Sequence, residues 1–175
     1  MDFLSYDDFT KLIELDPDYY RKRWSYYCDV MHVLTKTGVQ FKKVLELGPY
    51  LKPLIKNSDT IDNVDRGKTT FVFDASSVDN WKCIPDGSYD LFIGMQVLEH
   101  LSNQEKVWQE IKRVAKYALI TLPYRWVRPG NCHHGITSKV IRGWTDAVPE
   151  HCLISGRDKQ CRARRIICFY DLGEK

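Results

Sequence analysis

The chain has 175 residues, of which 43% are hydrophobic. A chain of this length and composition can form one full hydrophobic core but is too short to form two. Its formal net charge of +3 is small against 26 basic and 23 acidic side chains, so the overall balance gives no case for a nucleic-acid partner. The six cysteines show no Cys-x-x-Cys pair, the first residues lack a signal-peptide profile, and no apolar stretch is long enough to cross a bilayer. We therefore expect one cytoplasmic domain with reduced thiols and no membrane partner.

Hydrophobic patterning predicts an α/β fold in which helices alternate with buried strands. Residues 6–37 are helical in pattern, and Asp16-Pro17 restarts a helix within them. The apolar runs that follow lack polar alternation, which is typical of strands buried on both faces of a parallel sheet. Strands are expected at 43–47, 60–64, 70–73, 89–94, 117–122, 152–155 and 165–170, and further helices at 51–56, 103–115 and 138–147. The polar segment 156–164 would join the last two strands as an antiparallel hairpin.

An acid and a glycine close the first predicted strand. Glu46 and Gly48 fall at its carboxyl end, where open α/β sheets bind their ligands. Gly48 lets the backbone approach a ligand closely. Asp65 follows the second predicted strand, and its two acceptor oxygens suit the two hydroxyls of a ribose. The pattern predicts a site for a nucleoside cofactor.

The middle of the chain resembles the class I S-adenosylmethionine-dependent methyltransferases, particularly the small-molecule type. The resemblance covers about 44–123 and rests on the order of Val44-Leu45-Glu46-Leu47-Gly48, Asp65, Phe73-Asp74-Ala75 and the run 86–101. It implies a Rossmann-like three-layer sandwich with a mostly parallel seven-stranded sheet, N-terminal helices and a C-terminal antiparallel hairpin. One methyltransferase domain would span 1–175, with a helical lid at 1–40, a cofactor-binding core at 41–123, and a substrate-side loop, helix and hairpin at 124–175.

The resemblance also implies S-adenosyl-L-methionine as cofactor and S-adenosyl-L-homocysteine as its product. Glu46 would orient the cofactor's amino group through the loop after the first strand, Asp65 would hold the ribose hydroxyls, and Asp74 would accept from the adenine amino group. The other residues implied for the cofactor site are Gly48, Pro49, Tyr50, Arg66, Ala75, Met95, Gln96 and Val97. The loop at 48–53 has one glycine where the family usually has several, which leaves open a degenerate site that no longer binds.

Three histidines are candidates for a base that removes a proton from the acceptor, because imidazole titrates near neutral pH. His100 follows the fourth predicted strand, while His133 and His134 lie in the irregular stretch after the fifth. For His100, a ring that packs on the following helix is an equal alternative.

No metal is expected from the spacing of the candidate ligands. Magnesium would need an acidic cluster, and the sequence offers none. No standard zinc pattern fits Cys132, His133 and His134 with Cys152 or Cys161.

The residues after the fifth strand favour a small acceptor that carries a sugar or a negative charge. Trp126 offers a flat face for stacking, and Arg128 offers paired donors. The expected reaction is methylation of a hydroxyl on a sugar or natural-product intermediate, because the chain has no sizeable added substrate domain. A catalytically degenerate binding subunit is the alternative, and an RNA methyltransferase is a weaker one. The arginines at 157, 162, 164 and 165 are interpreted as the solvated face of a hairpin.

Overall fold

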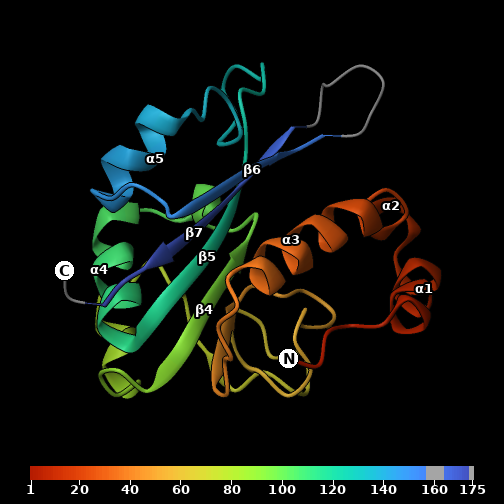
Figure 1. Cartoon of the computed structure of the whole chain (residues 1–175), viewed down its shortest axis with the longest axis horizontal. Coiled ribbons are helices and arrows are strands. Elements are labelled where there is room, and N and C mark those ends of the chain that lie inside the picture. Colours follow the sequence, from red (N-terminus) through yellow and green to blue (C-terminus); the bar gives the residue numbers. More distant parts are fainter. Residues whose placement is uncertain (157–163, 174–175) are drawn as a thin grey trace.

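The computed structural model describes residues 1–156 and 164–173 and folds them around a seven-stranded sheet (Figure 1). In chain order the strands are β1 (Val44–Leu47), β2 (Asp59–Asp62), β3 (Phe71–Val72), β4 (Tyr89–Met95), β5 (Ala115–Pro123), β6 (His151–Ser155) and β7 (Arg165–Asp171). Across the sheet their order is β3-β2-β1-β4-β5-β7-β6. The first five strands pair in parallel, whereas β7 runs antiparallel to both β5 and β6. The predicted mostly parallel sheet with a terminal hairpin is confirmed.

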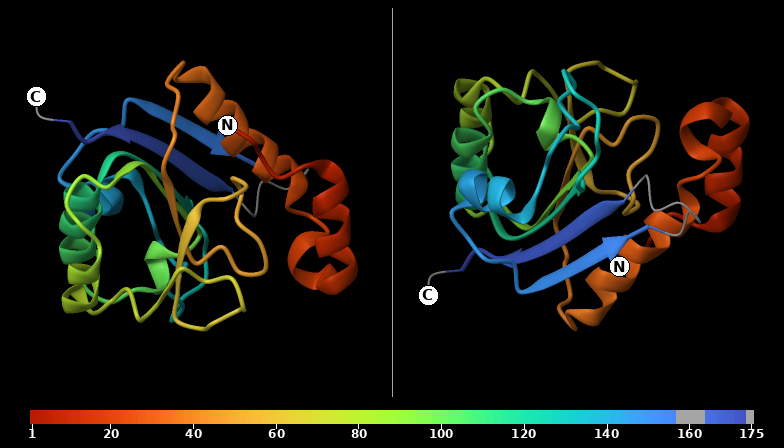
Figure 2. Two further views of the ribbon diagram at one scale, coloured as in Figure 1. Left: turned by 90° about the horizontal axis from the view of Figure 1, so that it is seen from below. Right: turned by 90° about the horizontal axis from the view of Figure 1, so that it is seen from above.

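Helices cover both faces of this sheet, which gives three layers (Figures 1 and 2). The helix α3 (Trp24–Lys36) lies on one face, after the shorter α1 (Tyr6–Leu15) and α2 (Pro17–Tyr20). On the other face lie α4 (Gln104–Val114) and α5 (Ser138–Thr145), and short 3-10 turns occur at η1 (Val78–Cys83) and η2 (Leu98–His100). Among the described residues, no helix has both the length and the apolar character that crossing a bilayer requires.

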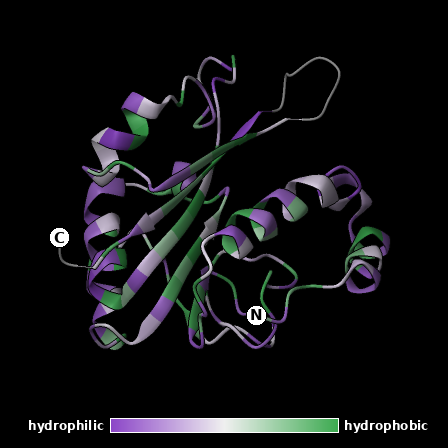
Figure 3. Ribbon diagram, in the orientation of Figure 1, coloured by the Kyte–Doolittle hydropathy of each residue, from purple (hydrophilic) through white to green (hydrophobic). Residues whose placement is uncertain are grey.

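The central strands are apolar on both faces because each face has its own core. Successive side chains of a strand point to opposite sides. In β4, Leu91 and Ile93 join the cluster under α3, and Phe92 joins the cluster under α4. Trp108 of α4 is fully buried, and its ring contacts Tyr170 of β7 at a centroid distance of 4.9 Å. Figure 3 shows the hydrophobic bands along β4 and β5 between the more polar outer surfaces of the helices.

The helix predicted at 51–56 is wrong. The chain between β1 and β2 forms turns and bends, and its backbone groups bond elsewhere. The N–H groups of Leu54 and Ile55 donate to the carboxylate of Glu46, while Pro53 has no N–H to donate. The N-terminal segment also pairs with this loop, since the N–H of Leu4 donates to the carbonyl of Leu54 at 2.8 Å.

The carboxyl end of the second predicted strand is also wrong. β2 ends at Asp62, and the backbone turns there because the N–H of Val64 donates to Oδ1 of Asp62 at 3.1 Å. Asp65 therefore lies beyond the strand, in an exposed turn. Of the predicted arginine cluster, Arg157 and Arg162 lie outside the described residues.

Candidate functional site

A cavity of about 500 Å³ lies at the carboxyl ends of β1, β2, β3 and β4. This volume is in the range of sites for small molecules and cofactors. The loops after these strands line it, and Tyr19 of α2 contributes from the N-terminal helices. Most of the residues predicted for the cofactor meet here, namely Gly48, Tyr50, Arg66, Asp74, Ala75, Met95, Gln96 and Val97.

Gly48 brings the loop after β1 against the loop after β4. Its φ of +59° is in the left-handed region, and a Cβ at this position would lie 2.4 Å from Cγ2 of Val97. Its N–H donates to the carbonyl of Ile61 in β2 at 2.8 Å. The left-handed backbone and the close approach of Val97 therefore both require a glycine at position 48, on this wall of the cavity.

Glu46 does not line this cavity itself but bonds to the loop after β1, through which the resemblance implied that it would act. Its Oε2 accepts from the N–H of Leu54 at 2.8 Å, and its Oε1 accepts from the N–H of Ile55 at 2.7 Å and the hydroxyl of Ser58 at 3.0 Å. Burial raises the pKa of Glu46 to about 7, although these donors act in the opposite direction. Glu46 and Pro49 line a smaller adjoining recess, and the carboxylate shapes the loop there.

Asp62, rather than Asp65, is the acid at the carboxyl end of β2. It lines the cavity with 9% of its surface exposed, and its Oδ2 lies 3.5 Å from Nε of Arg66. The guanidinium carbon of Arg66 lies 4.8 Å from the ring centroid of Tyr50. Asp65 is exposed, is not among the lining residues, and accepts from the N–H of Gly67 at 2.8 Å. The sequence prediction missed Asp62 because this residue falls inside the strand predicted at 60–64.

Gln96 presents an unpaired donor on the wall of the cavity. Its φ is +57°, and its backbone N–H donates to the carbonyl of Thr121 at 3.0 Å. Its side-chain Nε2 is buried and has no hydrogen-bond partner among the described residues. Buried polar groups are normally paired, so this amide is suited to an acceptor atom of a bound ligand.

Two of the three candidate histidines meet at the edge of the cavity. His100 comes from η2 and lines the cavity, and its Nε2 lies 3.3 Å from Nε2 of His133. Burial and the neighbouring His100 lower the pKa of His133. His134 is not part of this pair, because its Nδ1 accepts from the N–H of Arg128 at 3.0 Å within the same loop.

Glu99 adjoins the histidine pair and was missed by sequence reasoning. Its side chain is 0% exposed, and its Oε1 lies 4.0 Å from Nε2 of both His100 and His133. Neither carboxylate oxygen has a hydrogen-bond partner in the part of the chain that the structure describes. Burial raises the pKa of Glu99 to about 7, while Arg23 and Arg165 oppose the shift.

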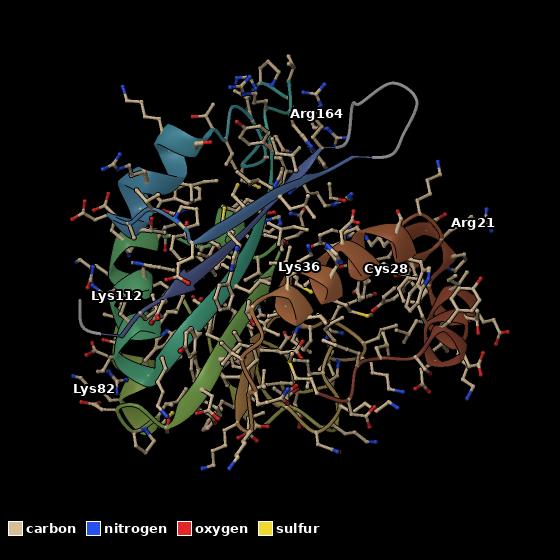
Figure 4. The ribbon with its side chains drawn as sticks, viewed as in Figure 1. Arg21, Cys28, Lys36, Lys82, Lys112 and Arg164 are labelled. Carbon is tan, nitrogen blue, oxygen red and sulfur yellow. The ribbon has the colours of Figure 1, made fainter. Side chains whose placement is uncertain are left out.

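An aromatic and basic surface extends from the histidines toward β7. The ring centroids of Trp126 and His133 lie 5.5 Å apart. The guanidinium carbon of Arg128 lies 4.9 Å from the centroid of the Trp126 ring, and that of Arg165 lies 5.9 Å from it. The indole N–H of Trp126 donates to the carbonyl of Arg164 at 2.6 Å. Figure 4 shows Arg164 at the upper end of β7, close to this loop.

Part of the sequence matches a known protein family, and the sheet order of the structure and the position of its cavity agree with that match. Residues 52–118 match the family model described as a methyltransferase domain. The chain has the Rossmann-like fold of the class I methyltransferases. In this fold the loops after β1, β2, β3 and β4 line the cavity, and the loop after β5 brings His133 to its edge.

Solved structures of methyltransferases are similar to this chain, but their sequence identities are so low that the similarity shows the fold alone. The 1,6-didemethyltoxoflavin-N1-methyltransferase of Burkholderia thailandensis is 12% identical with a TM-score of 0.63, over 93% of this chain and 84% of that one. N-methyltransferase NodS of Bradyrhizobium japonicum WM9 is 15% identical with a TM-score of 0.62, over 97% and 98%. The N-terminal domain of EvdMO1 is 11% identical with a TM-score of 0.54, over 86% and 84%. Comparison with curated protein sequences finds no match.

Proposed function

We propose that this domain transfers a methyl group from S-adenosylmethionine to a hydroxyl of a small molecule. The observation that carries the proposal is one cavity with an acid on its wall, a side-chain amide that is unpaired within the described part of the chain, and a histidine pair at its edge. The similar structures named above were crystallised with S-adenosylhomocysteine, the product that such a transfer leaves.

The residues of the cavity fit the cofactor by their chemistry. Asp62 offers carboxylate oxygens for the two ribose hydroxyls, and Asp74 offers an acceptor for the adenine amino group. The Nε2 of Gln96 supplies a donor that otherwise has no partner among the described residues. The bound cofactor supplies an electrophilic methyl group, so the protein has to align the acceptor with it and remove the acceptor's proton.

The N-terminal segment at 1–40 would act as a lid over this cofactor. Tyr19 lines the cavity, and its ring lies 4.9 Å from that of Tyr50. The hydroxyl of Tyr50 in turn donates to Oδ2 of Asp16 at 3.0 Å, which ties α2 to the loop after β1.

The histidine pair would receive the acceptor. His100 borders the cofactor cavity, and His133 lies between His100 and the ring of Trp126. A hydroxyl bound here could give its proton to a ring nitrogen of either histidine.

The surface beyond the histidines favours a sugar or an anionic acceptor. Trp126 offers a flat face for stacking, and Arg128 and Arg165 add positive charge. The EvdMO1 domain was crystallised in the presence of D-fucose, which supports a sugar. A nitrogen acceptor is the second candidate, because two of the similar structures are N-methyltransferases.

Calorimetric titration of the full chain with S-adenosylmethionine and S-adenosylhomocysteine tests the proposal. We expect one equivalent of each to bind with micromolar affinity. Release of S-adenosylhomocysteine would then be followed with sugars, phosphorylated sugars and amines as acceptors, and the methylated atom would be identified from the product. If the folded protein binds neither compound, the proposal fails and the chain is a degenerate binding subunit.

A further inference from the structure

The edge of the cavity gathers side chains that bind metals. One ligand atom each from His100, Cys132 and His133 lies within 4.8 Å of the others. Glu99 adds a carboxylate oxygen 4.0 Å from Nε2 of both histidines. These side chains come from two loops, after β4 and after β5, so their spacing in the sequence gave no zinc pattern.

We propose that Glu99, His100 and His133 bind a divalent transition-metal ion, with Zn²⁺ as the best fit. Two imidazoles and a carboxylate form a ligand set that zinc accepts, with a fourth position open to water or substrate. At ordinary zinc–nitrogen bond lengths, neighbouring ligands of a tetrahedral ion lie roughly 3.3 Å apart. The two Nε2 atoms already have this separation, at 3.3 Å, and the Glu99 oxygen needs to move by less than an ångström.

Cys132 is assigned to the surroundings of the ion rather than to its ligands. Its Sγ lies 3.4 Å from Nδ1 of His100, which is the ring nitrogen on the side away from the His133 contact. One imidazole does not bind the same ion through both nitrogens. Cys132 therefore orients the ring of His100, as outer groups commonly do for metal-bound histidines.

The burial of the Glu99 carboxylate is the second observation that points to an ion. The fully buried Glu99 carboxylate has no hydrogen-bond partner among residues 1–156 and 164–173, which is costly, and a bound cation would offset that cost. Arg23 and Arg165 act on the Glu99 carboxylate as nearby positive charges. Both arginines also repel a further cation, so they limit the affinity of the site.

This inference goes beyond the proposed function and can be tested without cofactor or acceptor. If both proposals hold, the acceptor hydroxyl would bind at the open position of the ion, which would lower the pKa of the hydroxyl so that its proton passes to solvent water and its oxygen takes the methyl group.

The test is calorimetric titration of the chelator-treated full chain with Zn²⁺ in the absence of cofactor. We expect one equivalent to bind, and we expect Glu99→Gln, His100→Ala and His133→Ala each to weaken binding by about 10-fold to 100-fold or more. The matched control is His32→Ala, which removes an exposed histidine of α3 outside the cluster and should leave the affinity unchanged. Cys132→Ser should retain binding, and the Co²⁺ form of the unchanged protein should lack a thiolate-to-metal absorption band.

Three outcomes would overturn the assignment. The first is that the wild-type protein binds Zn²⁺ no more tightly than the His133→Ala variant does. The second is that His32→Ala loses as much affinity for Zn²⁺ as His133→Ala. The third is that Cys132→Ser alone abolishes the binding of Zn²⁺. Circular dichroism of each variant shows whether it is folded. Titration with S-adenosylmethionine is a separate measurement, so failure of the metal site is distinguishable from failure of the cofactor site.

Discussion

Gly48 and Val97 are in direct contact across the wall of the cavity, so that a Cβ on Gly48 would lie 2.4 Å from Cγ2 of Val97. Gly48→Ala should lower the free energy of unfolding by about 2 kcal/mol, because it adds left-handed backbone strain and overpacking. Because the loop must move to relieve the clash, cofactor binding should weaken at least about tenfold, which corresponds to roughly 1.4 kcal/mol. Urea unfolding and calorimetry measure the two effects.

The matched control for this change is Gly143→Ala in α5. Nothing lies within 4 Å of a Cβ there, so the substitution should be neutral or slightly stabilising. Adding Val97→Ala to Gly48→Ala should restore part of the lost stability. Wild-type cofactor affinity in Gly48→Ala would show that this loop does not contact the cofactor.

The two acids near the end of β2 make a second pair of variants. Asp62→Ala should weaken binding of S-adenosylmethionine at least about tenfold, because it removes the carboxylate that faces the cavity. Asp65→Ala should leave the affinity within about twofold of wild type, since Asp65 is exposed and holds only the turn at Gly67. Calorimetry compares them, and the reverse order of effects would return the ribose role to Asp65.

Much of the fold could be predicted because buried parallel strands leave a clear pattern. In β4, Leu91, Phe92 and Ile93 are consecutive apolar residues, and the structure gives each face of this strand its own core. The helix predicted at 103–115 is α4, and its apolar residues Val107, Ile111 and Val114 are all buried. The spacing of apolar residues along the sequence reflects which side chains are buried. Strands and helices that form because one or both faces are buried can therefore be predicted from that spacing.

The candidate site was less predictable because single contacts decide it. Glu46 captures the N–H groups of Leu54 and Ile55, which removes the helix expected between β1 and β2. The helix propensities of the residues in this loop do not indicate hydrogen bonds to a side chain of the preceding strand. Glu99 stands directly before His100 in the sequence, but its proximity to His133 depends on how the loop after β5 folds back.

Glu46 should also make stability depend on pH. Its folded pKa of about 7 is above the usual glutamate pKa of 4.5, so the native state keeps a proton that the unfolded chain releases between these values. Its stabilising contribution is therefore complete below about pH 4.5 and is lost as pH rises through 7. Glu46→Gln should lower the free energy of unfolding by about 1–3 kcal/mol, because its NH₂ group cannot accept from the loop.

Urea unfolding of wild type and Glu46→Gln at pH 5 and pH 8 measures this effect. The difference between the two proteins should be larger at pH 5. Glu14→Gln, at an exposed acid of α1, is the control and should show no such change. A difference that instead grows with pH would mean that the three donors outweigh burial and lower the pKa of Glu46.

His133 should affect turnover more than cofactor binding. It contacts His100 at the edge of the cavity but is not among the residues that line it, so His133→Ala should leave the dissociation constant of S-adenosylmethionine nearly unchanged. With an acceptor from the screen, kcat should fall by about 100-fold or more, whether the ring accepts the proton or holds an ion that activates the hydroxyl. His134→Ala should have a smaller effect, because its ring supports the loop at Arg128. Equal loss of cofactor affinity and kcat in His133→Ala would mean that this histidine supports the cofactor site and that the acceptor binds elsewhere.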